Sequence, residues 1–238
     1  MLPEIKSCKY AAFDLEIYKS VTNMNNWLAE TPLGISCAAV ACDDYTQFWS
    51  TPRPCLDRHA ARAMVKDLQD IAKHQTLLTW NGAQFDFQVL AIESEMAKEC
   101  AELALNHVDM MFLVYAQRGH FLGLDKALAG SGVAGKVHEV TLTTGEKLTD
   151  MHGSKAPVLW QQGEYDAVLA YLKGDVSQPL ELARVIANTG VMSFVGFSGN
   201  TAMPCQLLTV AEICEYDDRG RWAKNRSQRK GFLRWIYE

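Results

Sequence analysis

The sequence has few of the features that mark membrane, secreted or zinc-stabilised proteins. No run approaches the roughly 18 uncharged apolar residues of a membrane span, and the first residues, MLPEIKSCKY, lack the apolar core of a signal peptide. The seven cysteines are scattered, form no CxxC pair and lie at no zinc-ligand spacing from a histidine. We therefore expect no membrane segment, no disulfide framework and no structural zinc, and a cytoplasmic location.

The composition is that of a folded chain. Of the 238 residues, 48% are hydrophobic and 21% are charged, which excludes a disordered protein. A chain of this length suits one domain with a small appendage.

Charge is unevenly distributed along the chain. The net charge is −5, but residues 219–238 alone carry +6, with the rings of Trp222, Phe232, Trp235 and Tyr237 between the basic side chains. This pattern has two interpretations, which the sequence leaves open. It suits a tail that binds a nucleic-acid strand, and it equally suits a solvated helix with an apolar stripe docked on the body.

Hydrophobic periodicity predicts an α/β body with a mixed sheet flanked by helices. The expected strands lie at residues 8–15, 34–42, 45–49, 76–80 and about 106–108. The expected helices lie at residues 56–74, 84–99 and 165–186, and Pro179 should kink or break the last of them. We also expect Asp109 to cap a helix and residues 138–149 to form a hairpin.

Two carboxylates share one face at the end of the first predicted strand. Residues two apart on a strand point the same way, so Asp14 and Glu16 should lie side by side. Buried without a partner they would repel each other and lose their hydration, and a divalent cation with oxygen ligands resolves both problems. A D-x-E pair is expected by chance about once in this chain, so it needs corroboration.

A second motif follows the fourth predicted strand. Asn81-Gly82 ends the strand, and Asp86 should fall in the first turn of a helix, where the helix dipole favours an anion. On position alone this is also an ordinary strand–turn–helix junction. Phe85 either stacks on a base or packs in the core.

A third motif lies on the last predicted helix. Tyr171 and Asp175 are four residues apart, so they share one face of the helix, about 5–6 Å apart at Cβ. An amphipathic helix with an ordinary polar edge would look the same. All three motifs in this order have a chance probability of order 0.001.

The three motifs together resemble the exonuclease motifs of the DEDD, or DnaQ-like, superfamily, which has the ribonuclease H-like fold. Tyr171 marks the DEDDy variant, because the histidine variant would place its histidine at the position of Ala170. The N-x-x-x-F-D form of the second motif is most similar to the proofreading domain of family B DNA polymerases and its stand-alone relatives. The resemblance covers roughly residues 8–188.

The resemblance implies a set of site residues. The expected ligands of two divalent ions, Mg²⁺ or Mn²⁺, are Asp14, Glu16, Asp86 and Asp175. Tyr171 would orient the attacking water, since a phenol with a pKa of about 10 is a poor base at neutral pH. The residues expected to meet the end of the strand are Leu15, Asn81 and Phe85.

We expect an exonuclease domain at residues 1–190 and a C-terminal extension at residues 191–238, made of a hairpin and a basic aromatic helix. We hypothesise that Arg226, Arg229 and Lys230 of this extension guide a strand toward the acidic site. The extension is also a candidate docking site for a replication or repair protein.

The resulting functional prediction is a two-metal 3′–5′ exonuclease that acts on single-stranded DNA and releases nucleoside 5′-monophosphates. Two alternatives stay open at this point. One is the same chemistry on RNA, because enzymes of the RNase D type share the tyrosine variant. The other is a non-catalytic nucleic-acid-binding scaffold, which would have no reason to keep four carboxylates and the tyrosine.

Overall fold

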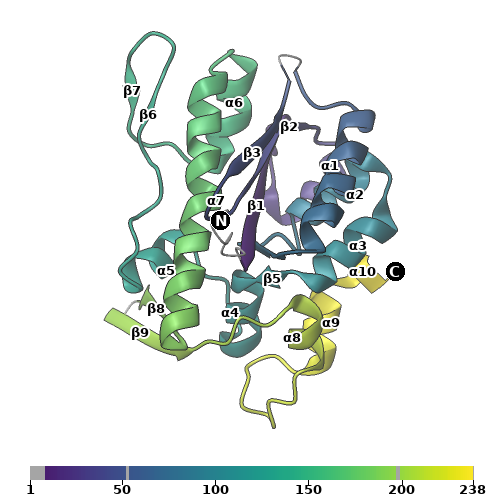
Figure 1. The fold of residues 1–238 in the computed structure, drawn as a ribbon, viewed down its shortest axis with the longest axis vertical. Helices are drawn as coiled ribbons and strands as arrows, with labels where there is room; N and C mark the ends of the chain where they lie inside the picture. The colour runs from purple at the N-terminus through teal and green to yellow at the C-terminus, as the bar shows by residue number, and fades with distance from the viewer. Residues whose placement is uncertain (1–8, 52–53, 197–198, 238) are drawn as a thin grey trace, which may run out of the picture.

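A five-stranded mixed sheet forms the centre of the computed structural model, which describes residues 9–51, 54–196 and 199–237 (Figure 1). The strand order is β3-β2-β1-β4-β5, with β1 antiparallel to β2 and parallel to β4. The strands are β1 (Tyr10–Ile17), β2 (Ile35–Ala41), β3 (Thr46–Ser50), β4 (Thr76–Thr79) and β5 (Val108–Asp109). The predicted mixed sheet is confirmed; Cys8, the first residue of the predicted first strand, lies outside the described residues.

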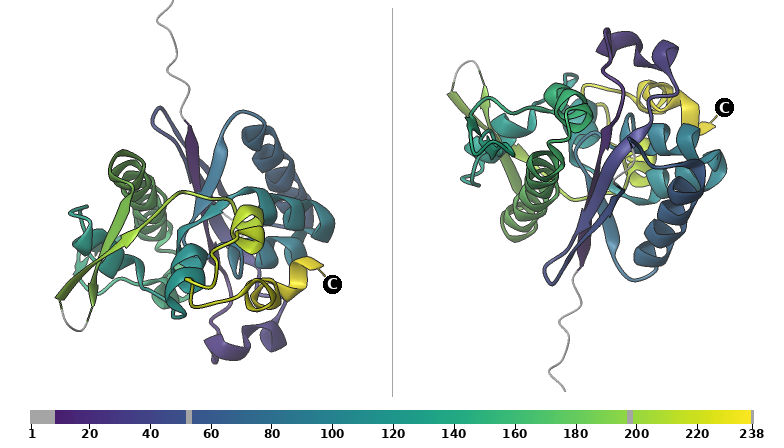
Figure 2. Two further views of the ribbon diagram at one scale, coloured as in Figure 1. Left: turned by 90° about the horizontal axis from the view of Figure 1, so that it is seen from below. Right: turned by 90° about the horizontal axis from the view of Figure 1, so that it is seen from above.

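Helices cover both faces of the sheet, and β1 contributes alternate residues to each layer. On one face lie α1 (Arg58–Ala72), α2 (Asp86–Ser94) and α3 (Ala97–Asn106), and on the other lies α7 (Tyr165–Thr189) (Figure 2). Phe13 and Leu15 pack in the α1–α3 layer, whereas Ala12 packs in the α7 layer. Because side chains alternate along a strand, Asp14 and Glu16 share the α7 side with Ala12.

Two helix predictions are wrong in detail. The helix expected at residues 84–99 is two helices, because Glu95 adopts a left-handed conformation (φ 56°) that a continuing helix cannot contain. Conversely, of the kink or break expected at Pro179, the break does not occur, because α7 continues for 25 residues through this proline. A proline removes one backbone hydrogen bond, and the burial of this helix over most of its length compensates.

Shorter elements surround the sheet. These are η1 (Met24–Glu30), α4 (Met110–Arg118), α5 (Leu124–Gly130), η2 (Gly153–Lys155) and α6 (Ala156–Gln161). The predicted hairpin at residues 138–149 is present as β6 (Val140–Thr141) and β7 (Lys147–Leu148). Within the described ranges, no helix combines the length and the apolar character needed to cross a membrane.

The C-terminal extension folds back beneath the sheet beside α3 and α4 (Figure 1). It begins with the predicted hairpin, β8 (Val191–Gly196) and β9 (Gly199–Pro204), and continues as three short helices instead of one. These are α8 (Val210–Glu215), α9 (Arg226–Phe232) and α10 (Arg234–Tyr237). Val210, Ile213 and Leu233 are fully buried in the same hydrophobic cluster as α7, so the extension shares the core of the body.

Candidate active site

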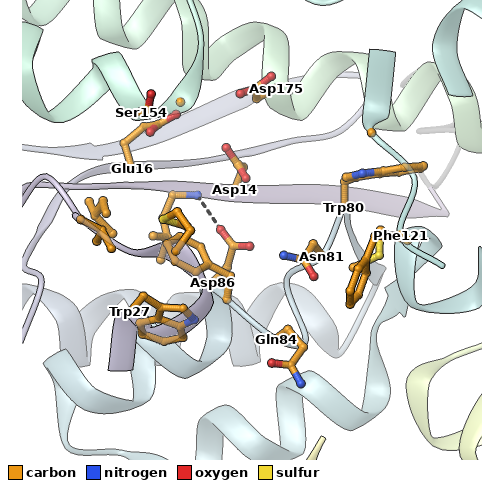
Figure 3. Close-up of a pocket in the computed structure, with 18 of the residues that line it drawn as sticks. Asp14, Glu16, Trp27, Trp80, Asn81, Gln84, Asp86, Phe121, Ser154 and Asp175 are labelled. Atoms are coloured by element: carbon orange, nitrogen blue, oxygen red, sulfur yellow. Dashed lines mark hydrogen bonds between the residues drawn. The ribbon is translucent and has the colours of Figure 1, made fainter. Parts of the chain in front are cut away.

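Three carboxylates meet between the sheet and α7. Asp14 and Glu16 come from β1, and Asp175 comes from α7 (Figure 3). One oxygen atom of each lies within 4.8 Å of the others. The β1–β2 register shifts directly after Glu16, and such an irregularity re-aims side chains at the end of a strand.

Asp86 lies beside this group without joining it. It is the first residue of α2 and is only 3% exposed. Its Oδ1 accepts a hydrogen bond from the backbone N–H of Leu15, at 3.1 Å, which ties the second motif to the first (Figure 3). The structure therefore brings together all four acidic residues predicted for the site, three of them in a single cluster.

Burial and mutual repulsion make these carboxylates difficult to ionise. Burial raises the pKa of Asp14 well above its usual range, and the charges of Asp86, Asp175 and Glu16 raise it further. Burial likewise raises the pKa of Glu16, and it raises the pKa of Asp86 to about 7. The cost of ionisation disappears when a cation binds, and the donors are the hard oxygen atoms that Mg²⁺ and Mn²⁺ prefer, so these residues fit divalent ions.

Lys136 joins the site from the loop after α5, and no sequence pattern marks it. Its Nζ forms an ion pair with Asp175 at 3.0 Å and donates a hydrogen bond to the Tyr171 hydroxyl at 2.9 Å. Burial alone would lower the pKa of Lys136, but the carboxylates around it outweigh burial and raise the pKa. Burial also raises the pKa of Tyr171, so its hydroxyl stays neutral.

Asp109 shapes the turn of the second motif. Its carboxylate accepts hydrogen bonds, each 3.0 Å long, from the backbone N–H groups of Asn81, Ala83 and Phe112. It thus caps α4, as predicted, and also holds Asn81 in a left-handed conformation (φ 75°). The turn is fixed by a residue buried behind it, which leaves the side chain of Asn81 facing the cavity.

A cavity of about 970 Å³ runs past the carboxylates and is lined by aromatic rings on both sides of them. Figure 3 shows Trp27 on one side of Asp86 and Trp80 with Phe121 on the other. Leu15, Asn81 and Phe85, the residues expected to meet the strand, all line this cavity. Trp80 also lines it, as does Phe232 of the basic tail, and sequence reasoning missed the rings of Trp27 and Phe121.

The three basic residues expected to bind nucleic acid do not line the cavity. Lys230 and Arg226 form ion pairs with Glu215, the latter at 4.0 Å. Arg229 is 1% exposed and pairs with Asp218 at 3.1 Å. This burial corrects the expectation that Arg229 binds nucleic acid. Its side chain stabilises the extension and is not available to a strand.

Comparisons with known proteins match this architecture. A family model described as RNase_H superfamily matches residues 33–183, which is more than half of the chain. Among solved structures, the family B DNA polymerase from the hyperthermophilic archaeon Pyrobaculum calidifontis is similar, with a TM-score of 0.52 and 17% sequence identity. That match covers 76% of this chain and 24% of the polymerase, so the two share a fold over about a quarter of the larger protein. A comparison with curated proteins gives no match.

Proposed function

The chain belongs to the RNase H superfamily, and from this premise we propose that it is a metal-dependent 3′–5′ exonuclease that removes nucleoside 5′-monophosphates from single-stranded DNA. The observation that carries the proposal is the cluster of Asp14, Glu16 and Asp175, within 4.8 Å, in the wall of a cavity lined by aromatic rings. Carboxylates concentrated in this way suit phosphodiester hydrolysis, and rings beside them suit bases.

The acidic residues would hold two divalent ions. Asp14, Glu16 and Asp175 supply the main ligand set, and Asp86 adds a fourth carboxylate next to Asp14. Two such ions, when bound, supply the positive charge that an anionic phosphodiester needs before it can be attacked and cleaved.

Tyr171 and Lys136 would position the reaction. The neutral Tyr171 hydroxyl lies one helical turn from Asp175, where it can orient a water molecule by a hydrogen bond. Lys136 holds both the hydroxyl and the Asp175 carboxylate, and so limits their rotation. Restricting the geometry of the nucleophile is a recognised source of rate acceleration.

The aromatic rings support a single-stranded substrate. Base–ring stacking is worth about 1–3 kcal/mol per base and tolerates any sequence, but it needs an unpaired base. Trp27 and Phe85 lie with their ring centroids 5.1 Å apart on one side of the carboxylates, and Trp80 lies on the other. A strand whose scissile phosphate sits at the carboxylates would therefore have rings available to the bases on both sides.

The proposal is tested with one DNA oligomer, labelled at its 5′ end in one sample and at its 3′ end in another, in the presence of Mg²⁺ or Mn²⁺. We expect a ladder from the 5′ label and immediate release of a labelled mononucleotide from the 3′ label. Asp175→Asn should abolish cleavage, and Tyr171→Phe should slow it about 10- to 100-fold, the value of one hydrogen bond to a charged group. Asp166→Asn, an exposed change on the same helix, is the matched control.

An RNA oligomer of the same sequence, assayed in parallel, decides which sugar is preferred. Faster cleavage of RNA would replace the DNA assignment. If folded wild-type protein cleaves neither oligomer, the catalytic proposal fails.

A further inference from the structure

The C-terminal extension supplies a wall of the cavity, although the family match ends at residue 183. The wall residue is Phe232, at the end of α9. Its ring stacks on Tyr115, with centroids 4.4 Å apart and planes 26° apart. Phe121 stacks on the same tyrosine, with centroids 5.3 Å apart and planes 14° apart. We call Tyr115, Phe121 and Phe232 the aromatic platform.

The aromatic platform is fixed to the catalytic side of the cavity. The backbone carbonyl of Phe232 accepts a hydrogen bond from Gln84 Nε2. Trp235, three residues later, donates its Nε1–H to the backbone carbonyl of Ala83 at 2.8 Å. Ala83 and Gln84 lie between Asn81 and Asp86, so the extension is attached directly to the turn of the second motif.

The aromatic platform also exposes one of its rings, that of Phe121, to solvent. Phe121 is 62% exposed and lines the cavity beside Trp80, whose Nε1–H donates to the carbonyl of Leu122 at 3.2 Å. Exposing a phenylalanine to this extent leaves apolar surface in water, and burying that surface beneath a ligand is favourable. Lys224 places its ammonium 5.1 Å from the centre of the Tyr115 ring, which puts a cation next to the platform.

We propose that the aromatic platform is a base-stacking site, on which a base of the bound strand stacks before the strand reaches the carboxylates. A nucleobase fits because Phe121 and Phe232 line the same cavity as the carboxylates, and both stack on Tyr115, whose ring centre lies 5.1 Å from the ammonium of Lys224. The extension is then a part of the substrate site and contributes to it through Phe232. The inference rests on the proposed function.

The test measures binding of a single-stranded oligomer to full-length protein carrying Asp175→Asn, which holds the strand without cutting it. Phe121→Ala and Phe232→Leu should each raise the dissociation constant about 5- to 150-fold, the loss of about 1–3 kcal/mol of stacking. Phe121→Trp should bind as the parent does, since it keeps an aromatic face. The matched control is Phe48→Ala, an exposed phenylalanine on β3 at the opposite edge of the sheet from β5.

A fluorescent adenine analogue, 2-aminopurine, placed at successive positions from the 3′ end reports stacking directly. Its emission should fall at one position on binding and recover in Phe121→Ala. Parent-like binding by both Phe121→Ala and Phe232→Leu would overturn the inference, as would an equal loss in Phe121→Trp. If the parent protein binds neither DNA nor RNA, the proposed function itself fails, and that outcome is separate from a failure of the platform.

Discussion

At the scale of single residues, the carboxylates of the site raise one another's pKa values by mutual repulsion. Asp14 lies within reach of three other carboxylates, and Lys136 is the cation that pairs with one of them in the structure. The pKa values of Asp14, Glu16 and Asp86 are raised by burial above those of an unfolded chain. The folded state therefore binds more protons than the unfolded state, and its stability falls as the pH rises through about 7, the pKa of folded Asp86.

The effect of Asp14→Asn on the stability of the protein should change sign when metal is added. In EDTA at pH 8 the variant should melt above the wild type, by roughly 2–4 °C per kcal/mol of repulsion relieved. In Mn²⁺ the wild type should gain about 2.7 kcal/mol at 100 times the dissociation constant, and the variant should gain less because it has lost a ligand. Thermal melts in EDTA and in Mn²⁺, with Asp166→Asn as control, measure both effects. Parallel curves for variant and wild type under the two conditions would contradict a metal site at Asp14.

The residues of the site differed in how far they could be predicted. Asp14, Glu16, Tyr171 and Asp175 could be named because the three motifs together resemble those of a known family, whereas strand and helix periodicity indicates only that the members of each pair share a face. Lys136 lies in a loop without periodicity, and only tertiary packing brings it within 3.0 Å of Asp175. Arg229 was misassigned because a basic side chain was assumed to be exposed, whereas Asp218 pairs with it in the interior.

At the scale of elements, the order of strands and helices could be predicted, but their junctions could not. The break at Glu95 and the continuity of α7 at Pro179 both depend on packing that local sequence does not encode. The hairpin of the extension was expected, but its attachment to the body was not. That attachment runs through α5, where Gly130 passes directly over the backbone of Phe194 on β8.

Gly130→Ala should loosen the attachment of the hairpin to α5. A Cβ at this position would overlap backbone atoms of Phe194, which cannot rotate away as a side chain can. We expect a loss of about 1–3 kcal/mol in the free energy of unfolding, the usual cost of overpacking. Urea unfolding measures this, with Gly231→Ala as control because a Cβ there meets open space. Equal stability of the two variants would show that the contact between α5 and β8 can relax.

At the scale of the whole molecule, the uneven charge is neutralised in part within the extension. Of the seven basic residues of 219–238, Arg226, Arg229 and Lys230 pair with acidic residues that precede them, Glu215 and Asp218. The Arg229–Asp218 pair is buried, and Arg229 also lies over the ring of Trp222 at 4.9 Å and donates to the carbonyl of Tyr216 at 3.0 Å. The charge pattern thus reflects ion pairs that stabilise the extension. Phe232 is the residue of the extension that lines the cavity.

The variant Arg229→Met distinguishes a structural role of the Arg229 charge from a role in guiding the nucleic-acid strand. Removing one partner of a buried pair leaves Asp218 uncompensated and should cost about 3–5 kcal/mol in the free energy of unfolding. The salt dependence of single-stranded DNA binding should stay the same, since a lost phosphate contact would flatten its logarithmic slope by about 0.7. Arg226→Met, at a side chain that is 54% exposed, should cost little stability and serves as the control. If Arg229→Met is as stable as the wild type and flattens the salt dependence of binding, the strand-guiding role is restored. That result would mean that the Arg229 side chain leaves Asp218 and contacts a phosphate.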